Sequence, residues 1–229
     1  MNQQIENLLY EALETELGGV EVYTSAVACA RNADLKKEWT KYLEQTRRHV
    51  KIVEGVLQEF GLDTEKETPG RKIVRSTGET LVENMEMARE AGDPDAAQIV
   101  AAESVVLAET KDHQNWSLLS EASGHLSGKQ KEALSAACKQ VEEEEDEHLY
   151  HSQGWARELW VQALGLSAVL PPPEERADVK TAIGAALAKK SRALLPKKEA
   201  KKSPPPRTHA AVAARGGRKS NGRSARRSH

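Results

Sequence analysis

The run from Leu134 to Leu159 constrains the fold more than any other stretch, because its apolar residues repeat at helical spacing around a glutamate and a histidine. Residues three apart share one face of a helix, so Glu145 and His148 are expected to point to the same side. An ionised carboxylate on an apolar face is costly unless it is paired or coordinates a metal. The spacing therefore predicts a long helix whose buried Glu-x-x-His pair needs partners on other helices.

The composition predicts one all-α domain followed by an extension. Glycine and proline are scarce before about residue 170 of the 229, and the apolar spacing there is helical throughout. We expect a helical domain over residues 1–170 and a Pro-, Ala-, Lys- and Arg-rich basic tail over 171–229. The tail should be mostly disordered, because it has too few apolar side chains to offset the entropy of ordering. Residues 176–194 have the composition of a short Ala-rich helix.

No feature of the sequence indicates export or membrane insertion. The N-terminus has no basic start followed by an apolar core, and no apolar run approaches the roughly 18 residues of a membrane span. The two cysteines, Cys29 and Cys138, do not suggest a disulfide framework. We therefore expect a cytoplasmic protein.

The first half of the helical domain is expected to contain two long helices. The first, about residues 3–30, carries Glu16 on its apolar face, and Tyr23 lies two turns further along that face. Its Gly18-Gly19 pair weakens the helix but allows a neighbouring helix or a substrate to approach closely. The second helix is capped by Asn32 or Asp34 and ends near Gly61. It carries His49 on its apolar face.

The second half is expected to contain two more long helices, preceded by a loop over residues 62–70 and a shorter helix over about 72–90. Asp93 and Pro94 are typical of a helix start, a capping side chain followed by proline at the first helical position. The apolar spacing that follows places Glu103 on the buried face of this helix. The last helix, about residues 129–165, contains the Glu-x-x-His pair.

Together these features resemble the ferritin-like superfamily of four-helix bundles. In that fold two iron or manganese ions are held by a glutamate from each of two helices and a Glu-x-x-His from each of the other two. The Glu16-to-Tyr23 spacing resembles the first helix of bacterioferritins, and residues 43–50, LEQTRRHV, resemble the small stress-associated proteins of the YciE type. The resemblance covers about residues 5–163. It implies an up-down-down-up bundle, a long crossover between its second and third helices, and these metal ligands: Glu16, His49, Glu103, Glu145 and His148.

The resemblance also assigns neighbours of this centre. Tyr23 is the candidate catalytic residue, since it can hydrogen-bond a ligand carboxylate, although packing is an equal alternative. With the ligands at one depth, His113 lies about 15 Å beyond Glu103 and is excluded as a ligand, while His151 is a candidate residue of the second shell or rim. Cys29 and Cys138 then lie about 20 Å above and 10 Å below the ligands, too far apart to bond within one chain.

One position departs from the family pattern. Thr46 stands where the second Glu-x-x-His would have its bridging glutamate, and threonine cannot supply a bidentate carboxylate. Glu44 is two residues away from that face and would need a bulged helix to point inward. Three carboxylates and two imidazoles still suit iron or manganese. The sequence leaves open two ions bridged by Glu145, a single ion, or a degenerate site.

The resemblance implies an iron centre, with manganese as the other candidate, that reacts with peroxide or oxygen in stress protection. Such a protein would be an oxidoreductase of the ferroxidase or peroxidase type and a homo-oligomer. One alternative is a non-enzymatic scaffold or nucleic-acid-associated bundle with a degenerate site. A further alternative is an enzyme similar to manganese catalases.

The charge of the chain is divided between the domain and its tail. Residues 189–229 carry a formal charge of +13, and the remainder carries −15. A basic segment of this kind, from Lys189 to His229, is typical of tails that bind the phosphates of DNA or RNA. A nucleoid-associated protein is then expected. A solubilising tail, or one that binds an acidic protein or the chain's own acidic domain, remains the alternative.

Overall fold

A computed structural model gives the structure of residues 2–177 and 180–194, and the secondary structure of these residues is entirely helical. The all-α class predicted from the sequence is therefore confirmed. The predicted tail from residue 195 onward, with its expected binding to nucleic acid, lies outside the described residues. The helices, in order, are α1 (Gln3–Cys29), α2 (Ala33–Glu59), α3 (Pro69–Glu90), α4 (Pro94–Ser123), α5 (Gly128–Ala163), α6 (Pro173–Ala177) and α7 (Thr181–Leu194).

Short polar side chains fix the helix starts, as the sequence predicts. The Asn32 side chain accepts hydrogen bonds from two backbone amides at the start of α2, and Asp93 does the same at the start of α4, where Pro94 is the first helical residue. Gly61 has a positive φ of 70° just after α2, which favours glycine at that position. Thr68 caps α3, so this helix begins a few residues earlier than predicted.

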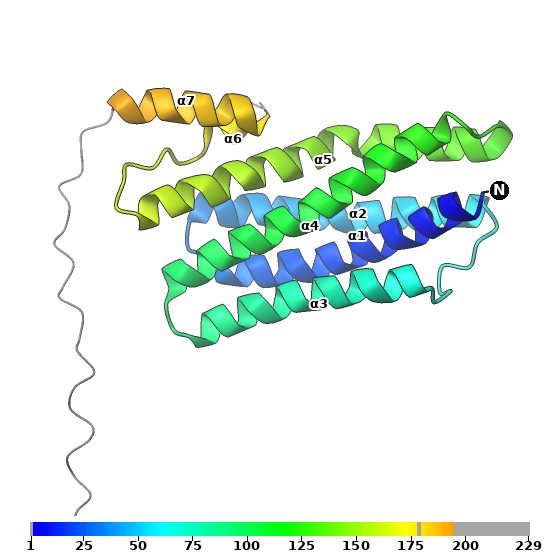
Figure 1. The fold of residues 1–229 in the computed structure, drawn as a ribbon, viewed down its shortest axis with the longest axis horizontal. Coiled ribbons are helices and arrows are strands. Elements are labelled where there is room, and N and C mark those ends of the chain that lie inside the picture. Colours follow the sequence, from blue (N-terminus) through cyan, green and yellow to red (C-terminus); the bar gives the residue numbers. More distant parts are fainter. Residues whose placement is uncertain (1, 178–179, 195–229) are drawn as a thin grey trace, which may run out of the picture. The chain divides into compact units, whose positions relative to one another are not determined.

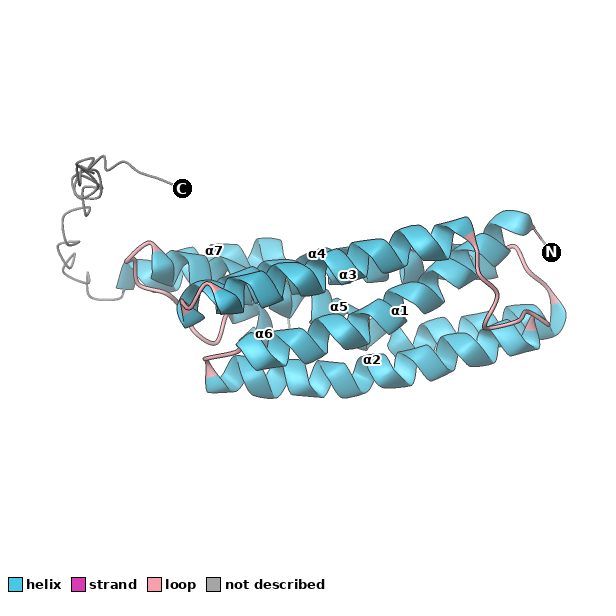
Figure 2. Ribbon diagram, turned by 90° about the horizontal axis from the view of Figure 1, so that it is seen from below, coloured by secondary structure: helices cyan, strands magenta, loops and turns pink. Residues whose placement is uncertain are grey.

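Four of the long helices pack in a ring, with α1 against α2, α2 against α5, α5 against α4 and α4 against α1. In Figure 1, α1 and α5 run in one direction, and α2 and α4 run in the opposite one. The fifth long helix, α3, carries the chain back between α2 and α4 and packs against α1 and α4. Figure 2 shows that the connecting loops lie at the ends of these helices.

The glycine pair in α1 lets two neighbours approach closely, as predicted. A Cβ atom added to Gly18 would lie 3.9 Å from the Cα atom of Gly78 in α3. A Cβ atom added to Gly19 would lie 3.1 Å from the side chain of Thr46 in α2. The contact at Gly18 would be an ordinary van der Waals one, whereas a side chain at Gly19 would require the Thr46 side chain to move by a few tenths of an ångström.

The apolar core consists of two clusters, one towards each end of the ring. One includes Trp39 and Trp155, and the other includes Leu57 and Leu134. On each of α1, α2, α4 and α5 the two clusters are separated along the helix by a short polar segment. Cys29 belongs to one cluster and Cys138 to the other, and both are free thiols. The prediction that they do not form a disulfide is confirmed.

The two short C-terminal helices, α6 and α7, contact α5 through ion pairs that include buried glutamates. Glu158 of α5 is fully buried, and its carboxylate accepts hydrogen bonds from Arg192 of α7 and from the backbone amide of Val169. Burial alone would raise the pKa of Glu158, but these donors hold it below its ordinary value. Residues 173–177 and 181–194 are thus helical and pack against α5. Among the described residues, none of the helices is long and apolar enough to cross a membrane.

Candidate metal centre

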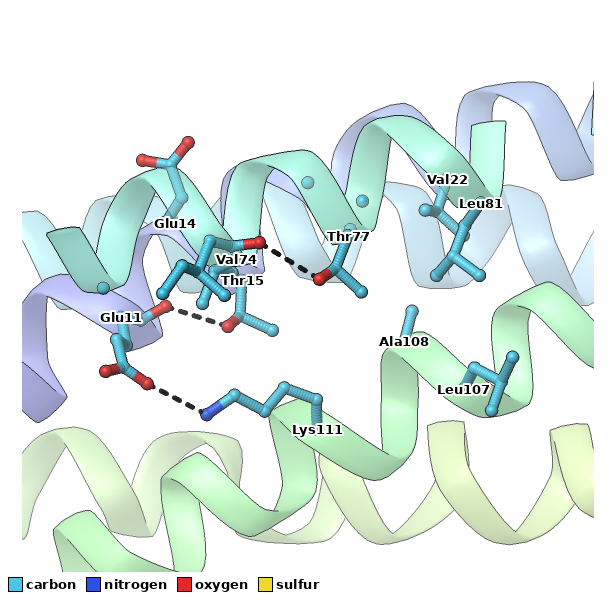
Figure 3. A pocket seen from close by; sticks show the side chains of 15 residues that line it. Glu11, Glu14, Thr15, Val22, Val74, Thr77, Leu81, Leu107, Ala108 and Lys111 are labelled. Atoms are coloured by element: carbon cyan, nitrogen blue, oxygen red, sulfur yellow. Dashed lines mark hydrogen bonds and ion pairs between the residues drawn. The ribbon is translucent and has the colours of Figure 1, made fainter. Parts of the chain in front are cut away.

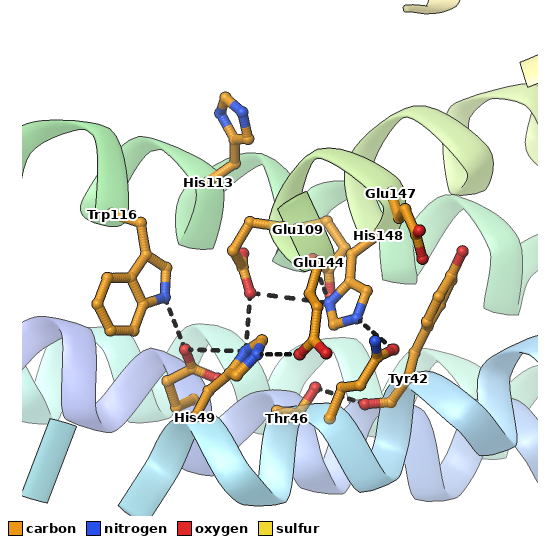
Figure 4. Close-up of polar contacts among 12 residues, drawn as sticks. Tyr42, Thr46, His49, Glu109, His113, Trp116, Glu144, Glu147 and His148 are labelled. Carbon is orange, nitrogen blue, oxygen red and sulfur yellow. Dashed lines mark hydrogen bonds and ion pairs between the residues drawn. The ribbon is translucent and has the colours of Figure 1, made fainter. Parts of the chain in front are cut away.

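The polar segments of the four ring helices meet in one buried cluster. The structure brings together four of the five predicted ligands, Glu16 of α1, His49 of α2, and Glu145 and His148 of α5. Each of these side chains is at most 2% exposed. Figure 4 shows the two histidines on facing helices. The fifth member of the cluster is Glu109 of α4, which the sequence analysis did not identify.

The expectation that Glu103 is the buried acid of α4 is wrong. Its side chain is on the exposed surface, where it accepts a hydrogen bond of 2.7 Å from Trp160. The reason is that α4 buries small residues and exposes some large ones. Ala101 and Ala102 face the core, whereas Leu107 is 62% exposed. Apolar spacing alone therefore assigned the inward face of this helix to the wrong residues.

The ligand atoms form two groups that share one carboxylate. Glu16, His49 and Glu145 make the first group, and Glu109, Glu145 and His148 make the second. The Nδ1 atom of His49 lies 2.9 Å from the Oε1 atom of Glu145 and 3.7 Å from that of Glu16.

In the second group, the Nδ1 atom of His148 lies 3.6 Å from the Oε2 atom of Glu109 and 3.8 Å from the Oε1 atom of Glu145. Two atoms that coordinate one ion at about 2.1 Å are themselves about 3–4 Å apart, so the spacing in both groups suits a shared cation.

Each histidine is oriented by a hydrogen bond to its outer nitrogen. The Nε2 atom of His49 lies 2.8 Å from a carboxylate oxygen of Glu144, and the Nε2 atom of His148 lies 3.1 Å from the amide oxygen of Gln45. These contacts cross between α2 and α5. Both rings consequently turn their Nδ1 atoms into the cluster, which is the arrangement typical of metal-bound histidine with an outer acceptor.

Several buried atoms of the cluster have no hydrogen-bond partner. They are Oε2 of Glu16, Nδ1 of His49, Oε2 of Glu109 and both carboxylate oxygens of Glu145. A buried polar atom left without a partner costs about 1–3 kcal/mol, and more when it is charged. These residues fall into the two ligand groups, and a cation in each group would provide their buried atoms with a partner. The donor set, oxygen and imidazole nitrogen, suits iron, manganese or zinc.

The cluster contains more carboxylates than positive groups, and this raises the pKa values of some of its side chains. Burial, and then the charge of Glu145, raise the pKa of Glu16 well above its ordinary value. Burial and the charges of Glu16 and Glu145 raise the pKa of Asp112 in the same way. For His49, burial alone would lower the pKa, but the adjacent Glu145 and Glu144 outweigh it and the pKa is raised. All three shifts favour proton uptake, as expected where carboxylates lack a cation.

Two aromatic residues are placed in matching positions beside the glutamates. Trp116, seven residues after Glu109 in α4, donates a hydrogen bond of 2.7 Å to Glu16. Tyr23, seven residues after Glu16 in α1, is buried, and burial followed by the Glu109 carboxylate raises its pKa well above the ordinary value. Its ring makes an edge contact with His148, at 5.9 Å between centroids. Tyr23 is thus beside the cluster, and its catalytic role stays a prediction.

Thr46 is at the edge of the cluster and contributes no carboxylate. It is buried, and its hydroxyl donates to the backbone oxygen of Tyr42 rather than into the cluster (Figure 4). Glu44, the other residue considered for this position, is exposed and pairs with Arg47. The cluster therefore has one shared carboxylate, that of Glu145, and a threonine in the place of a second.

Two further histidines lie outside the cluster. His113 is paired with Asp146 at 2.8 Å near the surface, in agreement with its exclusion as a ligand. His151 lies within a second buried network, where its Nδ1 atom is 2.9 Å from Glu38 and 2.8 Å from the hydroxyl of Tyr42. The Tyr42 ring packs on His148, at 4.3 Å between centroids, so His151 reaches the cluster through this tyrosine.

Two pockets lie between the long helices. One, of about 400 Å³, lies between α1, α3 and α4 and is mostly apolar, with Val74, Leu81 and Leu107 in its walls and Lys111 at one end (Figure 3). It is not lined by any ligand of the cluster. The other, of about 320 Å³, opens between α4 and α5 and includes Glu145 in its lining.

Comparisons of the whole chain with other proteins do not show a family. No protein-family model matches the sequence, and no curated protein or solved structure matches it significantly. What the structure shows is an all-helical chain in which buried carboxylates and histidines form two groups that could hold a metal ion.

Proposed function

We propose that this protein is a ferritin-like metalloprotein whose centre holds two ions of iron or manganese and reacts with peroxide or oxygen. The observation that carries the proposal is the pair of ligand groups that share Glu145, with unpartnered buried atoms facing one another. The ring of four helices, with α3 as a long connection between α2 and α4, supports the ferritin-like part of the proposal.

Each residue of the cluster would have a definite role as a ligand in such a centre. Glu16 and His49 would hold one ion, Glu109 and His148 the other, and Glu145 would bridge them. Bound iron or manganese supplies redox electrons, and the carboxylates favour the more highly charged oxidised state. Reduction of peroxide to two waters takes two electrons and two protons. The buried Asp112 would be a carboxyl close to the ligands that can carry one of these protons.

Metal titration of the metal-free, full-length chain tests the proposal. We expect two cobalt(II) or iron(II) ions to bind per chain under anaerobic conditions, and iron(II) then to be oxidised by peroxide at two ions per peroxide. Glu109→Gln should reduce the stoichiometry to one, since it removes a ligand of one group only. Wild-type protein that binds no metal would contradict the proposal. Metal binding without oxidation of iron(II) would support the metal site but contradict the proposed oxidoreductase activity.

The basic segment leads to a separate proposal about location. We propose that residues 189–229, with their charge of +13, tether the protein to DNA or RNA. Neutralisation of about eight phosphates would give a log–log salt dependence with a slope near −7 on duplex DNA. Deletion of residues 195–229 should then abolish DNA retardation at low salt. Unchanged retardation would contradict the tether.

A further inference from the structure

The pocket between α4 and α5 includes one residue of the buried cluster, Glu145, in its lining. Its lining changes from exposed acids, Glu121 and Glu142, through the partly exposed pair of His113 and Asp146, to Glu145 at its inner end. Glu145 is 2% exposed, and neither of its carboxylate oxygens has a hydrogen-bond partner. An unsatisfied buried acceptor at the end of an acidic pocket indicates a ligand that is a cation.

We propose that this pocket is the route by which a divalent cation enters the centre, with His113 and Asp146 as its first protein ligands. The inference rests on the proposed metal centre. His113 and Asp146 are hydrogen-bonded to each other at 2.8 Å, and an incoming ion would replace that contact with bonds to the imidazole nitrogen and the carboxylate oxygen, donors that suit a partly hydrated divalent ion. From there the bridging ligand Glu145 is the next carboxylate inward in the same pocket.

The charges around the pocket favour a cation over an anion. Four carboxylates line it, and the positive side chain among the lining residues is Lys180, in the segment between α6 and α7. The exposed Lys180 ammonium lies 5.4 Å from the centre of the ring of Tyr150, a residue outside the lining. Lys180 opposes an incoming cation. The four carboxylates outnumber this one lysine, so the net negative charge of the lining should raise the local concentration of a cation and its rate of entry.

The apolar pocket beside α3 is a poorer route for an ion. Its walls are mainly aliphatic, and its carboxylates, Glu11 and Glu14, are already paired with Lys111 and with two arginines. Loss of hydration in such surroundings is costly for a divalent cation. The two pockets can therefore be compared directly by blocking each in turn.

Rapid mixing of the metal-free, full-length chain with cobalt(II) tests the route, with the visible absorption of bound cobalt as the signal. Ser117 is an exposed residue in the lining, and Ser117→Trp should slow uptake by about tenfold or more, the lower range of electrostatic and steric gating effects. The matched control is Leu118→Trp, one residue along α4 and outside the lining. Thr77→Trp, which fills the apolar pocket instead, should leave the rate unchanged.

Two charge variants provide a second test that does not depend on a bulky side chain. Asp146→Asn should slow cobalt uptake several-fold, and Lys180→Gln should accelerate it, with both effects weakened by salt. Neither variant should change the final number of ions bound, which also checks that each variant is folded. Unchanged rates in Ser117→Trp and Asp146→Asn, with normal binding by the wild type, would overturn the route alone. A wild-type chain that binds no cobalt would overturn both the route and the centre.

Discussion

The two halves of the centre are built alike but are not equivalent. The first half, Glu16 of α1 and His49 of α2, and the second half, Glu109 of α4 and His148 of α5, each supply one glutamate and one histidine. In each half an aromatic residue follows the glutamate by seven positions. The difference lies three residues before the histidine, where the second half has Glu145 and the first has a threonine.

This difference shows how one carboxylate comes to serve two groups. A second bridging acid would add a fourth carboxylate to a buried cluster in which the pKa of Glu16 is already raised. The outer partners differ as well, because His49 faces the charged Glu144 and His148 faces the neutral amide of Gln45. The halves should therefore bind their ions with different affinities.

Glu145→Gln should have the largest effect, because it alters the one ligand that both halves share. Loss of an outer partner usually weakens metal binding by 10–100-fold, so loss of this ligand should weaken both sites by more than about 100-fold. The metal-free variant should be more stable than the wild type by about 1 kcal/mol, if the repulsion between Glu145 and the buried Glu16 outweighs the ion pair of Glu145 with His49. Calorimetric titration and chemical unfolding measure the two effects.

The control for this variant is Glu143→Gln, which changes an exposed acid on the same helix. Its metal affinity and its free energy of unfolding should stay at the wild-type values. Loss of only one ion from Glu145→Gln would show that the carboxylate belongs to one half and does not bridge.

Glu144→Gln should weaken the first half by about 10–100-fold and leave the second half almost unchanged. The amide keeps a hydrogen bond to His49 but removes the charge that makes this imidazole a stronger ligand. The two halves then have similar outer partners, so the two binding steps should become closer in affinity. Gln45→Glu is the reciprocal change and should strengthen the second half. A uniform loss of both ions in Glu144→Gln would argue against two distinct halves.

Thr46→Glu should make the halves more alike by giving the first one its own carboxylate next to the cluster. We expect the second ion to bind about tenfold more tightly, which corresponds to about 1.4 kcal/mol. The metal-free variant should lose about 1–3 kcal/mol of stability, because it buries another charge without a partner. Thr46→Gln has a similar size and no charge, so it should produce neither the gain in affinity nor the full loss of stability.

The sequence predicted the helices well because their signals are local. Caps such as Asn32 and Asp93, and apolar spacing on α1, α2 and α5, depend on neighbours a few residues away. The same spacing identified Glu16, His49, Glu145 and His148. It failed on α4, because this helix packs Ala101 and Ala102 inward and leaves Leu107 and Leu118 outside, so the apolar signal of its buried face is weak.

The residues missed on α4 and α5 share a physical cause. Glu109 and Asp112 are buried although their helix gives no strong apolar pattern around them, and Glu144 contacts the cluster only because α2 places His49 opposite it. Spacing within one helix does not report contacts between helices. One available signal was the repeat of a seven-residue step from a glutamate to an aromatic residue, Glu16 to Tyr23 and Glu109 to Trp116.

The smallest predicted effect is a pH dependence of the stability of the metal-free protein, which arises from titratable groups in and beside the first half. The raised pKa values of Glu16 and Asp112 mean that the metal-free folded state binds protons that the unfolded chain has released, so stability falls as pH rises above about 4.5. The raised pKa of His49 gives stability that is complete below 6.5 and is lost as pH rises through the folded value. We expect the metal-free protein to lose on the order of 1 kcal/mol between pH 5 and 7.

Metal should reverse this trend, because an ion competes with protons for the same carboxylates and imidazoles and binds more tightly as pH rises. Urea unfolding of metal-free and cobalt-loaded protein from pH 5 to 8 measures both slopes on one chain. Glu175, whose pKa is raised to about 7 by burial and by Glu38, lies outside the centre and contributes equally to both forms. Glu16→Gln should flatten the metal-free slope, whereas an unchanged slope in that variant would mean that the first half does not hold the extra protons.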